Sequence, residues 1–152
     1  LYRLLRNGDY LDEAFFYPVV LGGTLKFRAA AWDLDDLFMP PHNNRGIPGS
    51  LVYCEEDPLD SAIAQDTLLY GIYCGNLRRL LRDEITTAYL DEVESSVRRL
   101  VPPHFRDSAT VALMHNFTSG GPATAARDLE ALVGARFEEL RARRDSILAL
   151  LN

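Results

Sequence analysis

Cysteine, basic residues and long apolar runs are all scarce in this sequence. The two cysteines, Cys54 and Cys74, cannot supply the four ligands of a structural zinc site, and no histidine lies beside them at zinc-finger spacing. We expect two unpaired, partly buried thiols, and a disulfide between them is the alternative. No run approaches the roughly 18–20 apolar residues that a membrane-spanning helix needs, so we expect no membrane span in this chain.

Positive charge is the other shortage. Lys and Arg number 16 against 22 Asp and Glu, which gives a formal net charge of -6. An acidic domain of this size binds phosphate backbones poorly, so we expect no nucleic-acid partner.

The remaining composition is that of a globular domain. The chain has 152 residues, of which 47% are hydrophobic and 25% charged, and no linker or internal repeat divides it. It starts at Leu1, within what resembles a helix ending near residue 6. We therefore interpret residues 1–152 as a single fragment of one domain from a longer protein.

A β-hairpin is predicted near the N-terminus. Residues 15–21 are apolar and rich in strand formers, and residues 24–31 alternate, with Leu25 and Phe27 on one face and Lys26 on the other. Gly22-Gly23 between them suits the positive φ angles of a two-residue turn. Pro18 has no backbone N–H, so we expect its nitrogen to point away from the partner strand.

Helices are predicted for most of the chain after the hairpin. Residues 39–61 are expected to form a long loop, and a helix begins near Asp66. A second helix covers 84–100 and ends at Val101-Pro102-Pro103, because proline disfavours helix in the preceding residue. Its expected inward residues are Ile85, Ala88, Tyr89, Val93 and Val97.

Two more helices complete the prediction. A short one covers 106–117, and a long one begins at Gly120-Gly121-Pro122. The long helix carries an apolar stripe, and we expect four of its members to be buried together: Leu132, Phe137, Leu140 and Leu148. The predicted fold class is therefore α+β, mostly α, with a β-hairpin followed by a helical bundle.

The densest polar cluster comes directly after the hairpin. Asp33, Asp35 and Asp36 lie just beyond the second strand, and three carboxylates at a strand end repel one another unless a cation neutralises them. Mg²⁺ favours such oxygen ligands together with phosphate oxygens. A solvated acidic turn is the alternative interpretation. An Asp directly after a hairpin is also the arrangement of the kinase magnesium site, in which the catalytic Asp precedes the hairpin, as Asp9 does here.

These residues resemble a known family. The segment from Lys26 to Phe38 is similar to the strand and WDxD motif of the CotH kinases, atypical protein kinases first associated with spore coat proteins. The Leu-rich residues 77–82, together with Tyr89-Leu90, resemble the helical segment that follows the motif in that family, and residues 137–144 resemble its final helix. The resemblance implies the C-terminal lobe of a protein-kinase-like fold and ATP-dependent phosphorylation of protein Ser or Thr.

The resemblance also implies roles for individual residues. Asp33 matches the metal-binding Asp of the family, and Asp35 is a second candidate for a ligand of Mg²⁺ or Mn²⁺. Asp9 matches the position of the catalytic base, with Asp12 as a rival, and Asp36 matches a position without an assigned role. ATP is the implied co-substrate, and the implied partner is a coat or surface protein that serves as substrate. The location that the resemblance implies is the spore coat, the cell surface or the secreted fraction.

The sequence also departs from the family pattern. Where the family has an Asn before the hairpin, this chain has Asp12-Glu13-Ala14, and the Gly-rich loop and ATP-binding Lys of an N-terminal lobe are absent from it. Two further interpretations therefore stay open. One is a non-catalytic kinase-like module that binds a coat or surface protein, and the other is a helical scaffold domain with an incidental acidic turn.

Overall fold

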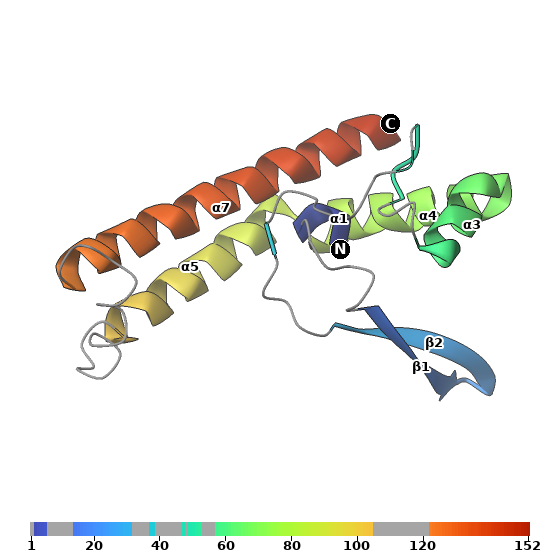
Figure 1. The fold of residues 1–152 in the computed structure, drawn as a ribbon, viewed down its shortest axis with the longest axis horizontal. Coiled ribbons are helices and arrows are strands. Elements are labelled where there is room, and N and C mark those ends of the chain that lie inside the picture. The colour runs from blue at the N-terminus through green and yellow to red at the C-terminus, as the bar shows by residue number, and fades with distance from the viewer. Residues whose placement is uncertain are drawn as a thin grey trace. The chain divides into compact units, whose positions relative to one another are not determined.

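The computed structural model describes residues 2–5, 14–31, 37–38, 47, 49–52, 57–104 and 122–152 (Figure 1). It is mainly helical, with one two-stranded antiparallel sheet, as the sequence predicts. The chain divides into two compact units, residues 1–76 and 77–152.

The first unit contains the predicted hairpin. A short helix α1 (Tyr2–Leu5) precedes β1 (Ala14–Leu21) and β2 (Thr24–Ala31), and the two strands pair from Leu21 opposite Thr24 to Ala14 opposite Ala31. Gly22 and Gly23 have φ angles of 58° and 76°, the left-handed pair that a type I′ turn requires. The turn, the register and the strand bounds confirm the sequence prediction.

The unit continues with two helices joined at Asp66. In α3 (Pro58–Gln65) the carboxylate of Asp57 accepts hydrogen bonds from the backbone N–H groups of Leu59 and Asp60, at 2.7 and 3.0 Å. The carboxylate of Asp66 accepts in the same way at the start of α4 (Thr67–Arg79). The expected loop over 39–61 is therefore wrong for residues 58–61, because an N-cap Asp followed by Pro starts a helix there.

Two tyrosines of α4 hold the segment around Leu51. The backbone N–H of Leu51 donates to the hydroxyl of Tyr70 at 3.0 Å, and the hydroxyl of Tyr73 donates to the carbonyl of Leu51 at 3.1 Å. Leu51 is buried, so both of its backbone groups need partners away from water. The two hydroxyls supply them, and the two tyrosine rings stack with centroids 6.4 Å apart.

The second unit is an antiparallel helical hairpin. One arm runs through the π-helix η1 (Leu80–Glu84) and α5 (Thr87–His104), and the other is α7 (Pro122–Leu151). Hydrogen bonds to α7 fix the direction, since Arg98 of α5 donates to the carbonyl of Glu130 while Arg78, in the last turn of α4 just before η1, donates to the carbonyl of Leu151. The start of α7 at Pro122 confirms the prediction, and the predicted helix over 106–117 lies outside the described residues.

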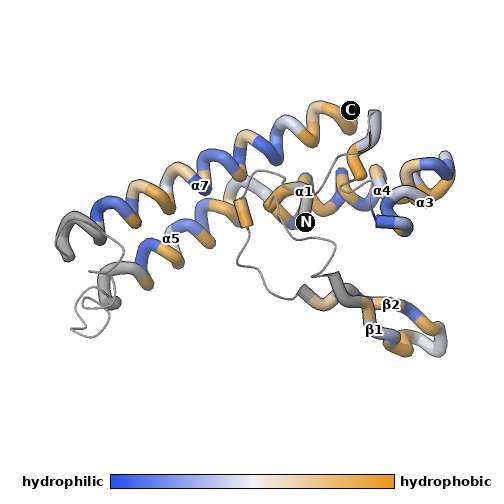
Figure 2. The backbone as a smooth tube through the Cα atoms, viewed as in Figure 1, coloured by the Kyte–Doolittle hydropathy of each residue, from blue (hydrophilic) through white to orange (hydrophobic). Residues whose placement is uncertain are grey.

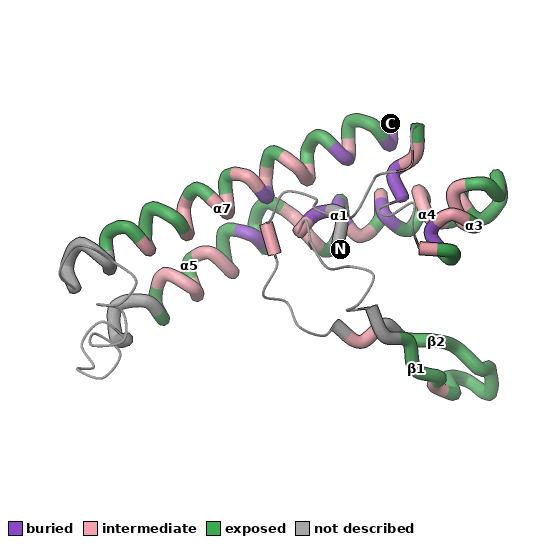
Figure 3. Tube along the Cα trace, in the orientation of Figure 1, coloured by how far each residue is buried: buried purple, intermediate pink, exposed green. Residues whose placement is uncertain are grey.

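The buried face of α7 differs in part from the expected stripe. Leu140, Ile147 and Leu151 are buried, and Phe137 is half-buried. With the little-exposed Arg144 between Leu140 and Ile147, these positions follow the alternating three- and four-residue spacing of a helix–helix seam. Apolar segments and buried or intermediate segments recur along α7 in Figures 2 and 3. Leu132 is 48% exposed, so the prediction that it is buried with Leu140 is wrong. It lies one residue from the seam, and a step of one residue rotates a helix by about 100°.

The buried face of α5 is also displaced from the prediction. Leu90 is buried, whereas Ala88 is exposed and Tyr89 is 50% exposed. The next inward residue of this face is Glu94, whose side chain is only 15% exposed. Three of the predicted residues are partly buried: Ile85, Val93 and Val97. A stripe chosen from apolar residues alone leaves out Glu94, because Glu94 is charged.

The end of α5 is a third correction. The helix continues through Pro102 and Pro103 to His104 rather than ending near residue 100. The fixed φ of proline, about −65°, is itself helical. The backbone therefore stays helical in this last turn, although neither proline has an N–H group to donate to a carbonyl of the preceding turn.

Candidate functional site

The residues that the sequence predicts for a magnesium site lie outside the described residues. This holds for Asp33 and Asp35, for the catalytic candidate Asp9, and for Asp36 and Asp12. The structure does describe the strand that leads to the acidic motif. β2 ends at Ala31, so Trp32 and Asp33 come next in the chain.

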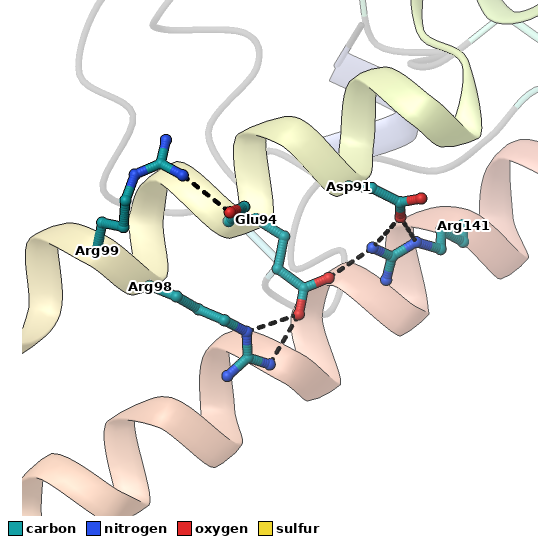
Figure 4. A pocket seen from close by; sticks show the side chains of 6 residues that line it. Asp91, Glu94, Arg98, Arg99 and Arg141 are labelled. Atoms are coloured by element: carbon teal, nitrogen blue, oxygen red, sulfur yellow. Dashed lines mark hydrogen bonds and ion pairs between the residues drawn. The ribbon is translucent and has the colours of Figure 1, made fainter.

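The polar cluster that the structure does describe lies between the two arms of the helical hairpin. Five of its residues lie on α5, between Asp91 and Arg99, and they share one face of that helix because they recur at spacings of three, four and seven residues. Arg141 joins them from α7, and Figure 4 shows its guanidinium extending toward the two acidic side chains of α5. The residues that line this open depression of about 360 Å³ are Asp91, Glu94, Ser95, Arg98, Arg99 and Arg141.

Glu94 and Arg141 are the centre of the cluster. One carboxylate oxygen of Glu94 accepts from Nε and Nη2 of Arg98, at 2.9 and 2.7 Å, and the other accepts from Nη2 of Arg141. Arg141 also donates from Nε and Nη2 to Asp91, at 3.0 and 2.6 Å. The guanidinium of Arg141 lies 5.9 Å from the centre of the Phe137 ring, which covers part of its face.

These pairings shift the ionisation of both central groups. Hydrogen bonds from Arg141, and then from Arg98, lower the pKa of Glu94 below its ordinary value of 4.5. Hydrogen bonds to Glu94 and Asp91 raise the pKa of Arg141. The carboxylate and the guanidinium therefore stay charged at neutral pH, and the pair joins α5 to α7.

Arg99 is bonded differently from the other arginines. Its two terminal nitrogens donate to the hydroxyls of Ser95 and Ser96, at 2.9 and 2.8 Å. Ser96 in turn donates to the carbonyl of Glu92. Arg99 thus lies on the rim of the depression, held by its own helix rather than by α7.

The chemistry available in this cluster is that of ion pairing. Both carboxylates are paired with arginines. The pKa of Glu94 is lowered, and a carboxylate of lowered pKa is a weak general base near neutral pH. No group of three or more His, Cys, Asp or Glu side chains arranged to hold a metal ion occurs among the described residues. We therefore assign the cluster to holding the two arms together.

Sequence patterns alone do not identify this cluster. Glu94 and Arg98 form an i,i+4 pair that is visible in the sequence, and such a pair is a signal of a helix surface. The bond between Arg141 and Glu94 spans 47 residues, and no local pattern predicts it.

Comparison with known proteins identifies no relative of this chain. No family model, curated protein or solved structure matches this chain. Within the part of the chain that the structure describes, no helix has both the length and the apolarity needed to cross a membrane.

Proposed function

We propose that this chain is the C-terminal-lobe portion of a CotH-like protein kinase, which transfers the γ-phosphoryl group of ATP to a Ser or Thr hydroxyl of a protein. The observation that carries the proposal is the hairpin together with the acidic motif directly after it. A two-glycine turn joins β1 to β2, and Trp32-Asp33-Leu34-Asp35 begins at the residue after β2. Kinases place their metal-binding Asp after such a hairpin.

The proposed roles follow from the chemistry of the donor set. Asp33 and Asp35 are two residues apart, and carboxylate oxygens are ligands that Mg²⁺ or Mn²⁺ accepts. The metal supplies positive charge that neutralises the transferring phosphoryl group. Asp9, before the hairpin, accepts the proton of the substrate hydroxyl and orients its oxygen toward the phosphorus.

The test is an assay of the full-length parent protein with labelled ATP and Mg²⁺ or Mn²⁺. Asp33→Asn keeps the shape of the side chain and removes its charge, so we expect phosphoryl transfer to fall by about 100-fold or more. Asp36→Asn is the matched control, since it removes the same charge three residues away, and it should stay within about threefold of wild type. A folded Asp33→Asn parent that phosphorylates at the wild-type rate overturns the proposal.

A second candidate function is a non-catalytic kinase-like module that binds a coat or surface protein. The observation that favours it is Asp12-Glu13-Ala14, which stands where the family has a metal-binding Asn. This candidate predicts no labelled product from the parent with either metal. A helical scaffold, the third interpretation, further predicts that neither metal shifts the melting temperature of the parent.

A further inference from the structure

The two edges of the hairpin differ in their capacity to bind another strand. Leu21 and Thr24 flank the turn at Gly22-Gly23, and the pair that flanks a two-residue hairpin turn is the hydrogen-bonded kind. Bonded and non-bonded pairs alternate along an antiparallel ladder. Pro18 and Phe27, three steps further, are therefore a non-bonded pair whose backbone groups point away from the ladder. Within the described part of the chain, no third strand pairs with either edge.

Pro18 blocks the edge formed by β1. Every second residue of β1 directs its N–H group outward along that edge. Pro18 is one of these residues, near the middle of the strand, and it has no N–H group to donate. The edge formed by β2 has no proline, so Leu25, Phe27 and Ala29 offer an unbroken series of outward N–H and C=O groups. Only the β2 edge can form a continuous ladder with an added strand.

The side chains along β2 define what kind of strand fits there. Leu25 and Phe27 are 61% and 67% exposed on one face, next to the exposed Val20 and Phe16 of β1. Figure 3 draws most of the hairpin around its turn as exposed. Lys26 and Arg28 are exposed on the other face. No acidic residue occurs anywhere in residues 14–31, so neither cation has an acidic partner within the hairpin.

We propose that the β2 edge binds an extended segment of a partner protein in which apolar and acidic residues alternate. Its backbone extends the sheet to three strands, its apolar side chains cover Leu25 and Phe27, and its carboxylates lie beside Lys26 and Arg28. Charge complementarity selects this occupant, because the hairpin carries two positive charges and no negative one. The proposal does not depend on phosphoryl transfer.

The test uses the full 152-residue chain and two labelled peptides. One alternates valine with glutamate over eight residues, and the other alternates valine with lysine. We expect the glutamate peptide to bind about tenfold more tightly in fluorescence anisotropy, since its charges oppose those of Lys26 and Arg28. Equal affinity for the two peptides, or binding of neither, overturns the proposal.

Matched variants on one rung of the ladder locate the binding edge. Val20 and Leu25 lie opposite each other, and both N–H groups point outward. Leu25→Pro should abolish binding of the glutamate peptide, and Val20→Pro should leave its affinity within about twofold. An equal loss in both variants contradicts the assignment to the β2 edge.

A side-chain variant keeps the test decisive where a proline disturbs the hairpin. Lys26→Glu with Arg28→Glu should reverse the preference, so that the lysine peptide binds more tightly. Two other outcomes overturn the proposed occupant. A concentration-dependent dimer in sedimentation that Leu25→Pro abolishes identifies a second copy of this chain. Binding to phosphatidylserine vesicles without binding of the peptide identifies a lipid surface.

Discussion

Nε of Arg144 on α7 lies 2.7 Å from the carbonyl oxygen of Ile85, although the two residues are 59 apart in the sequence. The same nitrogen donates to the carbonyl of Leu81 at 2.9 Å, at the π-helical end of the first arm. The last carbonyls of a helix have no partner within it. Arg144 supplies one from the opposite arm, and its side chain is only 12% exposed.

Replacing Arg144 with Met should destabilise the helical hairpin. The apolar length of the side chain is kept, but two partly buried carbonyls lose their donor, which costs about 1–3 kcal/mol. Urea unfolding followed by circular dichroism measures the loss. Arg82→Met is the matched control, because Arg82 is 67% exposed and its ion pair is with the adjacent Asp83. A similar loss in both variants would contradict the assigned role.

Acid should weaken the same hairpin through Glu94. The pKa of Glu94 is lowered in the folded state, so the unfolded chain binds its proton more readily. The stabilisation is complete above the ordinary pKa of 4.5 and is lost as the pH falls through the lower folded-state pKa. Glu94→Gln should therefore be less stable than wild type at pH 7, and the difference should shrink toward acid pH.

Urea unfolding at a series of pH values measures this difference. Glu138→Gln, at an exposed position of α7, is the control and should follow the wild-type curve. Added salt should reduce the effect of Glu94→Gln at pH 7, because it screens partly exposed ion pairs. A Glu94→Gln curve parallel to wild type across the acid range would refute the prediction.

Gly134 on α7 tests how closely the arms approach. A Cβ atom at this position would lie 2.7 Å from Nη2 of Arg98. The other terminal nitrogen of the same guanidinium, Nη1, donates to the carbonyl of Glu130. Alanine favours a helix over glycine by up to about 1 kcal/mol. Gly134→Ala should raise the stability of the protein by about that amount when Arg98 is replaced by alanine. The increase should be smaller when Arg98 is present, because the new methyl group then meets its guanidinium. Thermal unfolding of the four proteins measures the coupling, and additive effects would contradict the contact.

Tyr70 and Tyr73 are expected to protect different groups of Leu51. Tyr70→Phe removes the acceptor of the Leu51 N–H, a bond worth about 1 kcal/mol, so hydrogen exchange of that amide should accelerate by roughly fivefold. Tyr73→Phe removes the donor to the Leu51 carbonyl instead of the acceptor of the N–H, so it is the matched control. Exchange followed by NMR separates the two variants, and equal acceleration would rule out this division of roles.

Short-range patterns in the sequence predict several elements of this fold correctly. Gly22-Gly23 predicts the hairpin, because only a positive φ at both positions matches the twist of the strands. Pro122 predicts the start of α7 for a similarly local reason. The start of α3 carries a signal of the same kind in Asp57-Pro58, although the proline- and glycine-rich residues before it favour a loop.

Which face of a helix is buried depended on the tertiary structure. Apolar periodicity alone places Tyr89 and Leu132 inside, yet both are about half exposed. The inward faces instead include Glu94 on α5 and Arg144 on α7. Both residues are charged, so a sequence pattern predicts them at the surface. A charged side chain enters a helix seam only when the opposite arm supplies its partner.

The sequence by itself determined where the strands turn and where most of the helices begin, because turn angles and caps involve neighbours in the chain. Only the tertiary structure decided that Arg141 meets Glu94 and that Arg144 meets Ile85, across 47 and 59 residues. Such a bond depends on the alignment of two antiparallel helices, and that alignment is set by packing along their whole length rather than by either segment alone.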